Sequence, residues 1–478
     1  MKLKALLQGV EVLEMHADEQ MQIQQVVYDS RKCVQGCMFV AITGFASDGN
    51  RFIPMALEKG AAVIVTAVKP QMDVPYVLVA SDRLALAQIS GNFFQHPARD
   101  MVMIGITGTN GKTSATLLLK HVLEQVQGAK VGLIGTMENR IGDEVIPTER
   151  TTPESFELQS LFAQMRAAGC THVVMEVSSH ALSLERVGGV RYNVAAFTNL
   201  TEDHLDFHKT MEAYCDAKAI LFGRCDKAVL NQDDQYFARI RKQTACHVLT
   251  TSLQESGGLY AKDLMLQDDG VCFTAKLADQ QATVQLPIPG KFTVYNALTV
   301  LAIAVQLGIS LEDAAKALKT VHGVKGRVEV VPTPGKDYTI LIDYAHTPDG
   351  LENVLQAARG ICRGRLICVF GCGGDRDPIK RPIMGEIGVR LSDIAVITSD
   401  NPRCEEPAKI IQDICKGIPA DKKNFEVVEN RIDAIHRAMD IAEKNDIIVL
   451  AGKGHETYQE IHHVKYPLDE REVVAQYL

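Results

Sequence analysis

The chain has 478 residues, of which 46% are hydrophobic and 23% are charged, and its formal net charge is −9. That length exceeds a single ordinary core and predicts two or three domains. The acidic balance argues against a general nucleic-acid binder, although a pocket for a small anion depends only on its local cations. No stretch approaches the roughly 18 to 20 uninterrupted apolar residues of a membrane span.

The N-terminal segment and the cysteines both indicate a cytoplasmic protein. Residues 1–20 carry two lysines but turn acidic before any long apolar run, which is not the pattern of a secretory signal peptide. The twelve cysteines are scattered and include no CxxC pair. We therefore expect free thiols in a reducing compartment and no zinc site.

Short apolar runs of strand length alternate with amphipathic stretches along almost the whole chain, which predicts an α/β fold. The runs are hydrophobic on both sides, as parallel strands are when helices cover both faces of a sheet. The clearest runs are 61–68, 101–107, 172–177, 194–200, 366–371, 394–399 and 446–452.

Two interruptions divide this pattern into three domains. The segment 93–100 separates a first α/β unit from the next, and Pro and Gly interrupt the chain again over 322–337. We predict domains at 1–97, 98–327 and 328–478, the last one Rossmann-like. Within the middle domain, 277–290 predicts a hairpin or an extended segment.

The sequence GTNGKT (108–113) lies between a predicted strand, 101–107, and a predicted helix. Apolar residues at helical spacing continue from Thr113 to Val126, and Gly128 is a natural C-terminal cap. This context predicts a loop that binds nucleotide phosphate. The spacing is not the strict GxxxxGK[ST].

The loop has the chemistry that phosphate binding requires. Gly108 and Gly111 allow backbone N–H groups to turn inward, and the helix N-terminus adds partial positive charge. Lys112 supplies a full positive charge, and Thr113 or Ser114 offers a hydroxyl to Mg²⁺.

Polar residues follow the next two predicted strands, where open α/β sheets place their ligands. Taken singly, Glu176 is a capping carboxylate and His204 a loop histidine. Together, beside a phosphate loop, they supply oxygen and nitrogen ligands suited to a Mg²⁺ that bridges phosphates. Lys218 follows on a predicted helix.

Seven motifs occur along the chain in one order: GTNGKT (108–113), MEVSSHAL (175–182), TNLTEDHLDFH (198–208), AKAILF (217–222), YNAL (295–298), GVKGR (323–327) and DYAHTPDGL (343–351). Together they resemble the motifs of the Mur ligases of peptidoglycan synthesis, and the resemblance runs from about residue 28 to 456. These enzymes use ATP to join an amino acid to a UDP-N-acetylmuramoyl peptide.

The resemblance implies a role for each of these positions. The first domain would bind the UDP-muramoyl substrate, the central domain ATP and the third domain the amino acid. Lys218 would be carbamylated by CO₂ and help to hold a second Mg²⁺, which requires a neutral amine; a surface helix lysine is the alternative. The implied catalytic residues are Lys112, Glu176, His204, Lys218 and Arg327, and the implied metal ligands are Thr113, Glu176, His204 and Lys218. The implied ATP contacts are Gly108, Thr109, Asn110, Gly111, Lys112, Thr113, Ser114, Asn296 (to adenine), Arg327 and Asp343.

Residues 28–61 resemble the UDP-binding domain of those family members that add the third residue, to UDP-MurNAc-L-Ala-D-Glu. For the DSR stretch at 29–31, the alternative is that these residues only form a turn and bind no ligand. Two positions depart from one well-known form of the motif, where Arg150 replaces an asparagine and Leu184 a glutamine. The implied contacts are Tyr28, Ser30, Phe45, Ala46, Ser47, Thr151, Thr152, Ser178, Leu184 and Arg186.

The C-terminal domain resembles members that add meso-2,6-diaminopimelate, which carry DNPR, here residues 400–403. The distal end of that amino acid bears a carboxylate as well as an ammonium. An arginine side chain can bind that carboxylate through two parallel hydrogen bonds, whereas the competing amino acid lysine has no distal carboxylate. The implied contacts are Arg376, Asp400, Asn401, Pro402, Arg403, Gly452 and Glu456.

Other readings of the chain remain open at this point. They are a lysine-adding ligase of the same family, a folylpolyglutamate synthetase-like ligase, and a catalytically silent nucleotide-binding regulator. The last predicts loss of Lys112, Glu176, His204 or Lys218, and all four are present. We expect small-molecule substrates, no nucleic-acid partner and a monomer.

Overall fold

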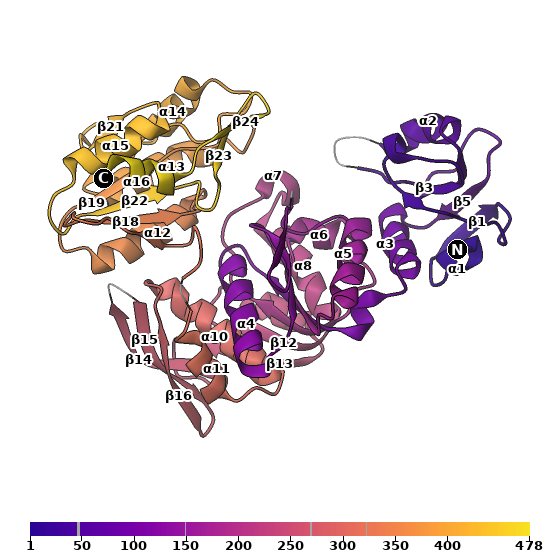
Figure 1. The fold of residues 1–478 in the computed structure, drawn as a ribbon, viewed down its shortest axis with the longest axis horizontal. Coiled ribbons are helices and arrows are strands. Elements are labelled where there is room, and N and C mark those ends of the chain that lie inside the picture. Colours follow the sequence, from indigo (N-terminus) through magenta and orange to yellow (C-terminus); the bar gives the residue numbers. More distant parts are fainter. Residues whose placement is uncertain (45–47, 149, 268–269, 322) are drawn as a thin grey trace.

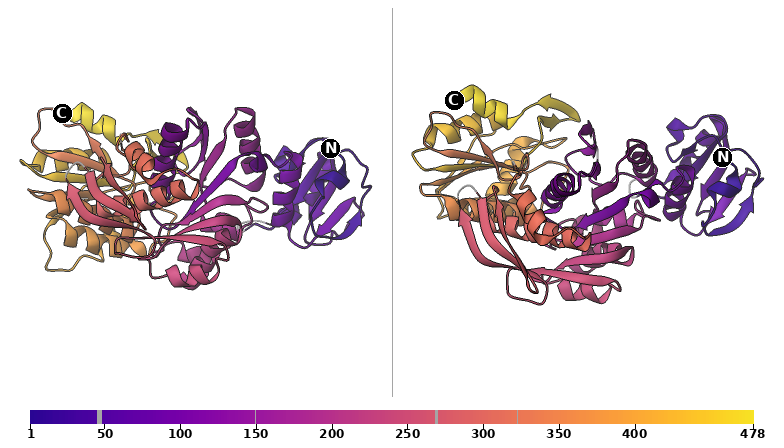
Figure 2. Two further views of the ribbon diagram at one scale, coloured as in Figure 1. Left: turned by 90° about the horizontal axis from the view of Figure 1, so that it is seen from below. Right: turned by 60° about the horizontal axis from the view of Figure 1, so that its bottom comes forward.

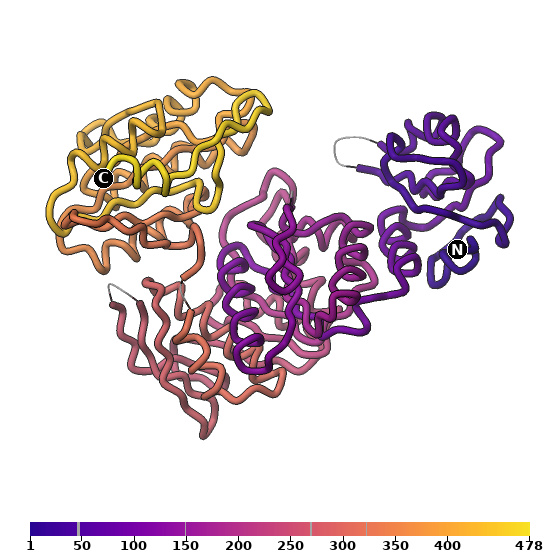
Figure 3. Tube along the Cα trace, viewed as in Figure 1, coloured from indigo at the N-terminus to yellow at the C-terminus, as the bar shows by residue number. Residues whose placement is uncertain are grey.

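The computed structural model describes residues 1–44, 48–148, 150–267, 270–321 and 323–478. Three predicted uridine-nucleotide contacts, Phe45, Ala46 and Ser47, lie outside the described residues. The described strands form three large sheets and a two-stranded ribbon, in three lobes that follow one another along the chain (Figures 1 and 3). No helix in these ranges combines the length and the apolarity that crossing a membrane requires.

The first lobe is built on a sheet of order β1-β5-β4-β3-β2, parallel except for the edge strand β1. Its helix α3 begins after Ser81, whose side chain accepts a hydrogen bond from the Leu84 N–H. The elements are α1 (Leu3–Leu6), β1 (Val12–His16), β2 (Val26–Val27), β3 (Cys37–Ala41), α2 (Ile53–Glu58), β4 (Ala61–Thr66), β5 (Tyr76–Val79) and α3 (Asp82–Phe93).

The second lobe contains the longest sheet, of order β16-β15-β14-β13-β12-β11-β6-β10-β7-β8-β9. Its strands run parallel from β14 to β7, and antiparallel strands extend both edges. The strands are β6 (Val102–Thr107), β7 (Val131–Ile134), β8 (Asn139–Ile141), β9 (Glu144–Ile146), β10 (His172–Glu176), β11 (Tyr192–Phe197), β12 (Cys225–Asn231), β13 (His247–Ser252), β14 (Leu259–Gln267), β15 (Gly270–Leu277) and β16 (Gln280–Leu286).

Helices cover both faces of this sheet. Ile104 and Ile106 of β6 belong to one hydrophobic core, while Met103, which comes directly before them, belongs to the other. Successive side chains on a strand point to opposite faces, so β6 is buried on both. The first core includes α4 (Lys112–Gln127), α10 (Lys291–Gln306) and α11 (Leu311–Leu318); on the second lie α5 (Ser155–Ala167), α6 (Ser179–Ser183), α8 (Met211–Ala219) and α9 (Phe237–Lys242), and α7 (Leu205–His208) precedes α8.

The third lobe has a sheet of order β17-β18-β22-β19-β20-β21, parallel except for β17. It is also covered on both faces, by α12–α14 on one and by α15 and α16 on the other. The elements are β17 (Glu329–Val331), β18 (Thr339–Asp343), α12 (Pro348–Ile361), β19 (Leu366–Phe370), α13 (Lys380–Leu391), β20 (Ile394–Ile397), α14 (Pro407–Cys415), β21 (Phe425–Val427), α15 (Arg431–Ile441), β22 (Ile447–Ala451), β23 (Tyr458–Ile461), β24 (Val464–Pro467) and α16 (Glu470–Tyr477).

The first and third lobes lie at opposite ends of the molecule, with the central lobe between them (Figures 1 and 2). Helix α3 faces the central lobe and packs against α5. The predicted α/β class and the three-lobed organisation are confirmed, and the segment 277–290 contains β16, which pairs with β15 as a hairpin. The strands of each sheet fall inside one predicted domain range, and the boundaries at 97/98 and 327/328 stay predictions.

Candidate active site

The phosphate loop joins β6 to α4 at the carboxyl edge of the central sheet. Gly108 has φ +151° and Gly111 has φ +86°, values that L side chains rarely adopt. A Cβ on Gly108 would lie 1.9 Å from Thr198 Oγ1, and one on Gly111 would lie 2.4 Å from Asn296 Oδ1. Both glycines are therefore required, and the predicted adenine contact Asn296 lies directly against the loop.

Two lysine amines meet at one backbone carbonyl of this loop. Lys112 Nζ donates to the carbonyl oxygens of Gly108 (2.9 Å) and Thr109 (2.8 Å), and Lys218 Nζ donates to the same Gly108 oxygen at 2.8 Å. Lys218 is only 1% exposed, so it is not a surface lysine. Burial lowers the pKa of both amines, and the charge of Lys112 lowers that of Lys218 further. The site therefore favours a neutral Lys218 amine.

Glu176 is buried at the end of β10 and is held by two threonines. Its Oε1 accepts hydrogen bonds from Thr113 Oγ1 and from the Thr136 N–H, and its Oε2 accepts one from Thr136 Oγ1, all at 2.9 Å. Of the two hydroxyl residues considered from the sequence, Thr113 and Ser114, it is Thr113 that lies beside this carboxylate. Thr136 was not predicted, because only the fold brings it next to Glu176.

His204 lies in the loop before α7, where its φ of +55° is unusual for a residue with a side chain. Its ring is nearly half exposed, with Nε2 3.4 Å from Asp203 Oδ2 and its centroid 4.7 Å from that of His180. Thr113 and Glu176 supply the oxygen donors that Mg²⁺ prefers, and His204 adds an imidazole nitrogen. In the described part of the chain no group of three His, Cys, Asp or Glu could hold a metal alone. A Mg²⁺ at this place would need phosphate oxygens to complete its coordination shell.

Two residues reach the phosphate loop from this side, Arg327 at the end of the central lobe and Asp349 of the third lobe. Arg327 Nη2 donates to Thr113 Oγ1 at 3.3 Å, and its buried Nε has no hydrogen-bond partner. Asp349, at the start of α12, accepts hydrogen bonds from Asn110 Nδ2 (2.5 Å) and Thr201 Oγ1 (3.1 Å). Asp343 accepts one from the Val328 N–H at 2.8 Å, beside Arg327. The predicted ATP residues of both lobes therefore meet at one seam.

Of the predicted contacts of the first lobe that the structure describes, Tyr28 lies at the seam with the central lobe and Ser30 lies inside the first lobe. Tyr28 Oη donates to Glu157 Oε1 of α5 at 2.9 Å, and burial followed by the charge of Glu157 raises the pKa of this phenol. Ser30 is buried and lies 3.4 Å from Met55 Sδ.

The predicted muramoyl-peptide contacts of the central lobe lie beside Glu176. Thr152 Oγ1 donates to the Glu176 carbonyl (2.8 Å) and lies 3.4 Å from Ser178 Oγ, and Arg186 Nη1 donates to the Thr152 carbonyl at 3.2 Å. Thr151 Oγ1 is 3.0 Å from Thr136 Oγ1. Leu184, partly buried, caps the C-terminus of α6.

The predicted amino-acid contacts surround the turn 400–403 at the end of β20. Arg403 has φ +50°; its Nη1 donates to the Gly374 carbonyl at 2.9 Å and its Nε is 3.2 Å from Glu460 Oε2. A Cβ on Gly373 would lie 2.8 Å from Arg403 Nη1 and 3.8 Å from Arg376 Cγ, so the two arginines flank one glycine. Glu460 was not predicted, and its pairing with Arg403 arises only from the fold.

The remaining residues of this group form a buried network. Asn401 Nδ2 donates to Glu456 Oε2 (2.8 Å), and the fully buried Lys453 ammonium lies 3.1 Å from the same oxygen. Both contacts are made by Oε2, and they hold the Glu456 carboxylate in one orientation. A Cβ on Gly452 would lie 2.6 Å from Asp400 Oδ2, a buried oxygen with no hydrogen-bond partner. Pro402 completes the turn, and its carbonyl accepts from the Glu405 N–H.

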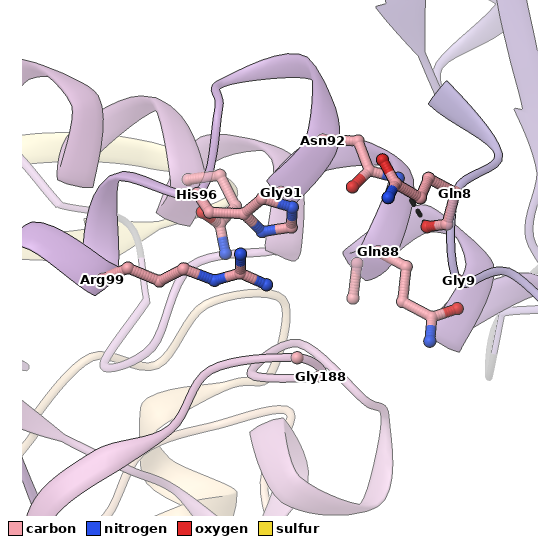
Figure 4. Close-up of a pocket in the computed structure, with 11 residues that line it drawn as sticks. Gln8, Gly9, Gln88, Gly91, Asn92, His96, Arg99 and Gly188 are labelled. Carbon is pink, nitrogen blue, oxygen red and sulfur yellow. Dashed lines mark hydrogen bonds between the residues drawn. The ribbon is translucent and has the colours of Figure 1, made fainter. Parts of the chain in front are cut away.

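A cavity of about 410 Å³ lies elsewhere, between the first and central lobes (Figure 4). It is lined by α3, by the linker residues His96 and Arg99 and by Gly188 and Gly189. None of the predicted site residues lines it. The cavity marks a loosely packed part of that seam and is separate from the active site.

Comparisons with known proteins match the whole length of this arrangement. Three family profiles cover the chain: "Mur ligase family, catalytic domain" at residues 22–95, "Mur ligase middle domain" at 106–304 and "Mur ligase, glutamate ligase domain" at 326–454. A ligase of Clostridium acetobutylicum is 48% identical over 481 residues, which span 100% of this chain and 99% of the relative.

The chain belongs to the Mur ligase family. The Clostridium acetobutylicum relative is named UDP-N-acetylmuramoyl-L-alanyl-D-glutamate–2,6-diaminopimelate ligase 1, and a Bacillus cereus relative with the corresponding name is 42% identical over 100% of this chain and 98% of its own length. The resemblance drawn from the motifs is therefore confirmed.

Solved structures agree with this membership of the Mur ligase family. A structure titled as a UDP-N-acetylmuramoyl-L-alanyl-D-glutamate–2,6-diaminopimelate ligase superposes with a TM-score of 0.72 at 30% identity, covering 100% of this chain and 98% of that one. A folylpolyglutamate synthase of Mycobacterium tuberculosis superposes with a TM-score of 0.64 at 18% identity but covers only 77% of this chain, so it shares the fold alone.

Proposed function

We propose that this Mur ligase joins meso-2,6-diaminopimelate to UDP-N-acetylmuramoyl-L-alanyl-D-glutamate with ATP, releasing ADP and phosphate, in peptidoglycan synthesis. One observation carries the choice of amino acid: Arg403 and Arg376 flank Gly373, in the lobe that contacts the phosphate loop. Two guanidinium groups suit an amino acid with two carboxylates. ATP and a nucleotide-linked substrate also fit a cytoplasmic enzyme.

The first step activates a carboxylate of the dipeptide. One carboxylate oxygen attacks the γ-phosphorus of ATP, and the bond from that phosphorus to the bridging oxygen breaks. ADP departs, and the dipeptide now carries an acyl phosphate. Lys112 and Arg327, which contact Thr109 and Thr113 of the loop region, would neutralise the charge on the oxygens of the transferring group. When bound by Thr113, Glu176 and His204, Mg²⁺ would supply further charge neutralisation of the phosphates.

The second step forms the amide. The α-amine of the incoming amino acid, once deprotonated, attacks the acyl carbon, and the bond from that carbon to the phosphate oxygen breaks. Asn401 and Lys453 hold Glu456 in place for the ligand's distal ammonium, while Arg403 takes the distal carboxylate. The amine is then delivered to the seam where Asp349 contacts Asn110.

Carbamylation of Lys218 belongs to the same proposal. The neutral amine that burial favours at this position can attack CO₂. The N–C bond forms, one C=O π bond opens and the nitrogen loses a proton, which gives a carbamate anion. Such a group would change a buried neutral amine into an oxygen ligand for a second Mg²⁺.

The test is phosphate release from ATP with purified protein, Mg²⁺ and UDP-MurNAc-L-Ala-D-Glu. Release is expected only when meso-diaminopimelate is also present, and mass spectrometry should find the tripeptide nucleotide. Stimulation by L-lysine with none by diaminopimelate would contradict the proposed amino acid. Release with glutamate and a folate in place of the muramoyl nucleotide would contradict the proposed pathway.

A further inference from the structure

Three arginines from two lobes converge on one carboxylate, that of Glu154. Arg150 Nη1 and Arg186 Nε each lie 2.9 Å from Glu154 Oε1, and Arg83 Nη1 of α3 lies 3.5 Å from Oε2. The Arg83 and Arg186 side chains are about 15% exposed, Glu154 is less exposed still, and Arg150 is half exposed. The cluster is therefore largely enclosed but has an open side at Arg150.

The cluster has more positive than negative charge. Glu154 is the anion that all three arginines contact, and Tyr28, which lies near Glu154, is a neutral phenol that donates to Glu157. The charge of the three guanidinium groups therefore exceeds that of the carboxylate they share. Arg186 Nε is close to Glu154 but makes no hydrogen bond with it, so a buried N–H is left without an acceptor. A ligand carboxylate would supply both negative charge and a hydrogen-bond acceptor.

The cluster also lies at the right point along the substrate. Arg186 donates to the Thr152 carbonyl, and Thr152 donates to the carbonyl of Glu176, which touches the phosphate loop. On the other side, Arg83 Nε donates to the Thr43 carbonyl, next to the loop expected to bind the uridine nucleotide. The cluster therefore spans from the nucleotide-binding lobe to the edge of the ATP site.

A terminal D-glutamyl residue carries two carboxylates. One is phosphorylated and becomes the amide, while the other stays anionic through both steps. Holding that second carboxylate helps to present the first one, and the excess positive charge of the cluster suits an anionic group near the reacting end.

We propose that Arg83 and Arg150 join Arg186 in recognising the non-reacting carboxylate of the D-glutamyl residue, and that Glu154 is the positioning residue that gathers the three cations. This inference rests on the proposed function, because it takes the acidic dipeptide as substrate. Since Arg83 comes from the first lobe, substrate binding also ties the first lobe to the central one.

The test compares two substrates, the natural dipeptide nucleotide and an analogue in which the non-reacting carboxylate is a carboxamide. For the wild-type enzyme we expect a KM for the analogue about ten- to hundredfold higher, as for loss of a charge-assisted contact. Arg83→Ala and Arg150→Ala should raise the KM for the natural substrate and bring the ratio of the two KM values toward one. Arg83→Lys should recover part of the ratio.

Arg191→Ala is the matched control, because Arg191 is an exposed arginine of the central lobe paired with Asp226, and it should leave both KM values unchanged. Glu154→Gln should raise the KM for the natural substrate more than that for the analogue and so lower the ratio of the two KM values, because it misplaces the arginines that recognise the carboxylate. A KM for ATP equal to that of the wild type would show that each variant is folded.

An unchanged ratio in both Arg83→Ala and Arg150→Ala would overturn the inference. A second result would also overturn it. If Arg83→Ala weakened inhibition by UDP alone by the same factor as it raised the KM for the whole substrate, Arg83 would bind the diphosphate and not the carboxylate. Failure of the proposed function is a separate result: wild-type protein would release no phosphate with any amino acid, while calorimetric titration could still compare binding of the two nucleotides.

Discussion

Replacement of Arg403 by alanine tests how the amino acid is chosen. In the structure this guanidinium donates from Nη1 to the Gly374 carbonyl and pairs through Nε with Glu460, so we expect Nη2 to take part in binding a ligand carboxylate. Removing it deletes the contact with the distal carboxylate of diaminopimelate. The ATP residues are on other elements and keep their contacts.

The magnitude follows from two effects of the same sign. A hydrogen bond to a charged group contributes about 1.5–3 kcal/mol, which corresponds to a KM for diaminopimelate about 10- to 150-fold higher. The substitution also leaves Glu460, whose side chain is 20% exposed, without its cation, and its negative charge then opposes the ligand carboxylate. Arg403→Ala should therefore be more damaging than the double variant with Glu460→Gln.

The assay is steady-state phosphate release with varied diaminopimelate, then with varied ATP and with L-lysine. The KM for ATP should stay within about twofold, and the preference for diaminopimelate over lysine should fall by the factor lost for diaminopimelate. Arg437→Ala, which breaks an exposed ion pair with Glu426 in the same lobe, is the control. Equal losses for diaminopimelate, lysine and ATP would refute the reasoning, because Arg403 would then be structural.

Four further substitutions test other parts of the account. Lys218→Ala should reduce kcat strongly, with partial rescue by a small added carboxylate such as acetate; unaltered turnover would exclude the carbamate. Gly111→Ala should abolish ATP binding in calorimetric titration, because φ is +86° and Asn296 Oδ1 would lie 2.4 Å from the new Cβ. Arg431→Met leaves the fully buried Glu470 without its cation and should lower the unfolding free energy in urea by about 3–5 kcal/mol; a loss below 1 kcal/mol would contradict this. Burial and nearby cations lower the pKa of His455 to about 4, so the unfolded chain takes up a proton first as pH falls below about 6.5. Stability should then drop between pH 6.5 and 4 by at most about 3 kcal/mol from this group, and His455→Gln should flatten that slope in urea titrations.

The parts of the site that the sequence predicted are those encoded by neighbouring residues. The strand, the GTNGKT loop and the helix up to Gly128 follow from local periodicity and from glycines that adopt positive φ, and the structure has β6 and α4 in these places. The helix carrying Lys218 was predicted in the same way. Its burial could not be, because that depends on Tyr214 and on the distant Gly108 carbonyl.

The residues that were missed make contacts between distant segments. Glu460 meets Arg403 only because β23 lies alongside the turn 400–403, and Asp349 meets Asn110 across 239 positions of sequence. Arg150 was recognised as a departure from the family motif, but its partner was not. Spacing by four residues to Glu154 normally indicates a pair on a helix, whereas α5 begins only at Ser155.

The most direct test of the central claim is a crystal structure of the protein with UDP-MurNAc-L-Ala-D-Glu, a non-hydrolysable ATP analogue and meso-diaminopimelate. The account predicts that the distal carboxylate of the amino acid lies against the Arg403 guanidinium and its distal ammonium against Glu456, with its α-amine facing the phosphate loop. Diaminopimelate bound away from Arg403, or with its distal end turned toward the phosphate loop, would contradict it.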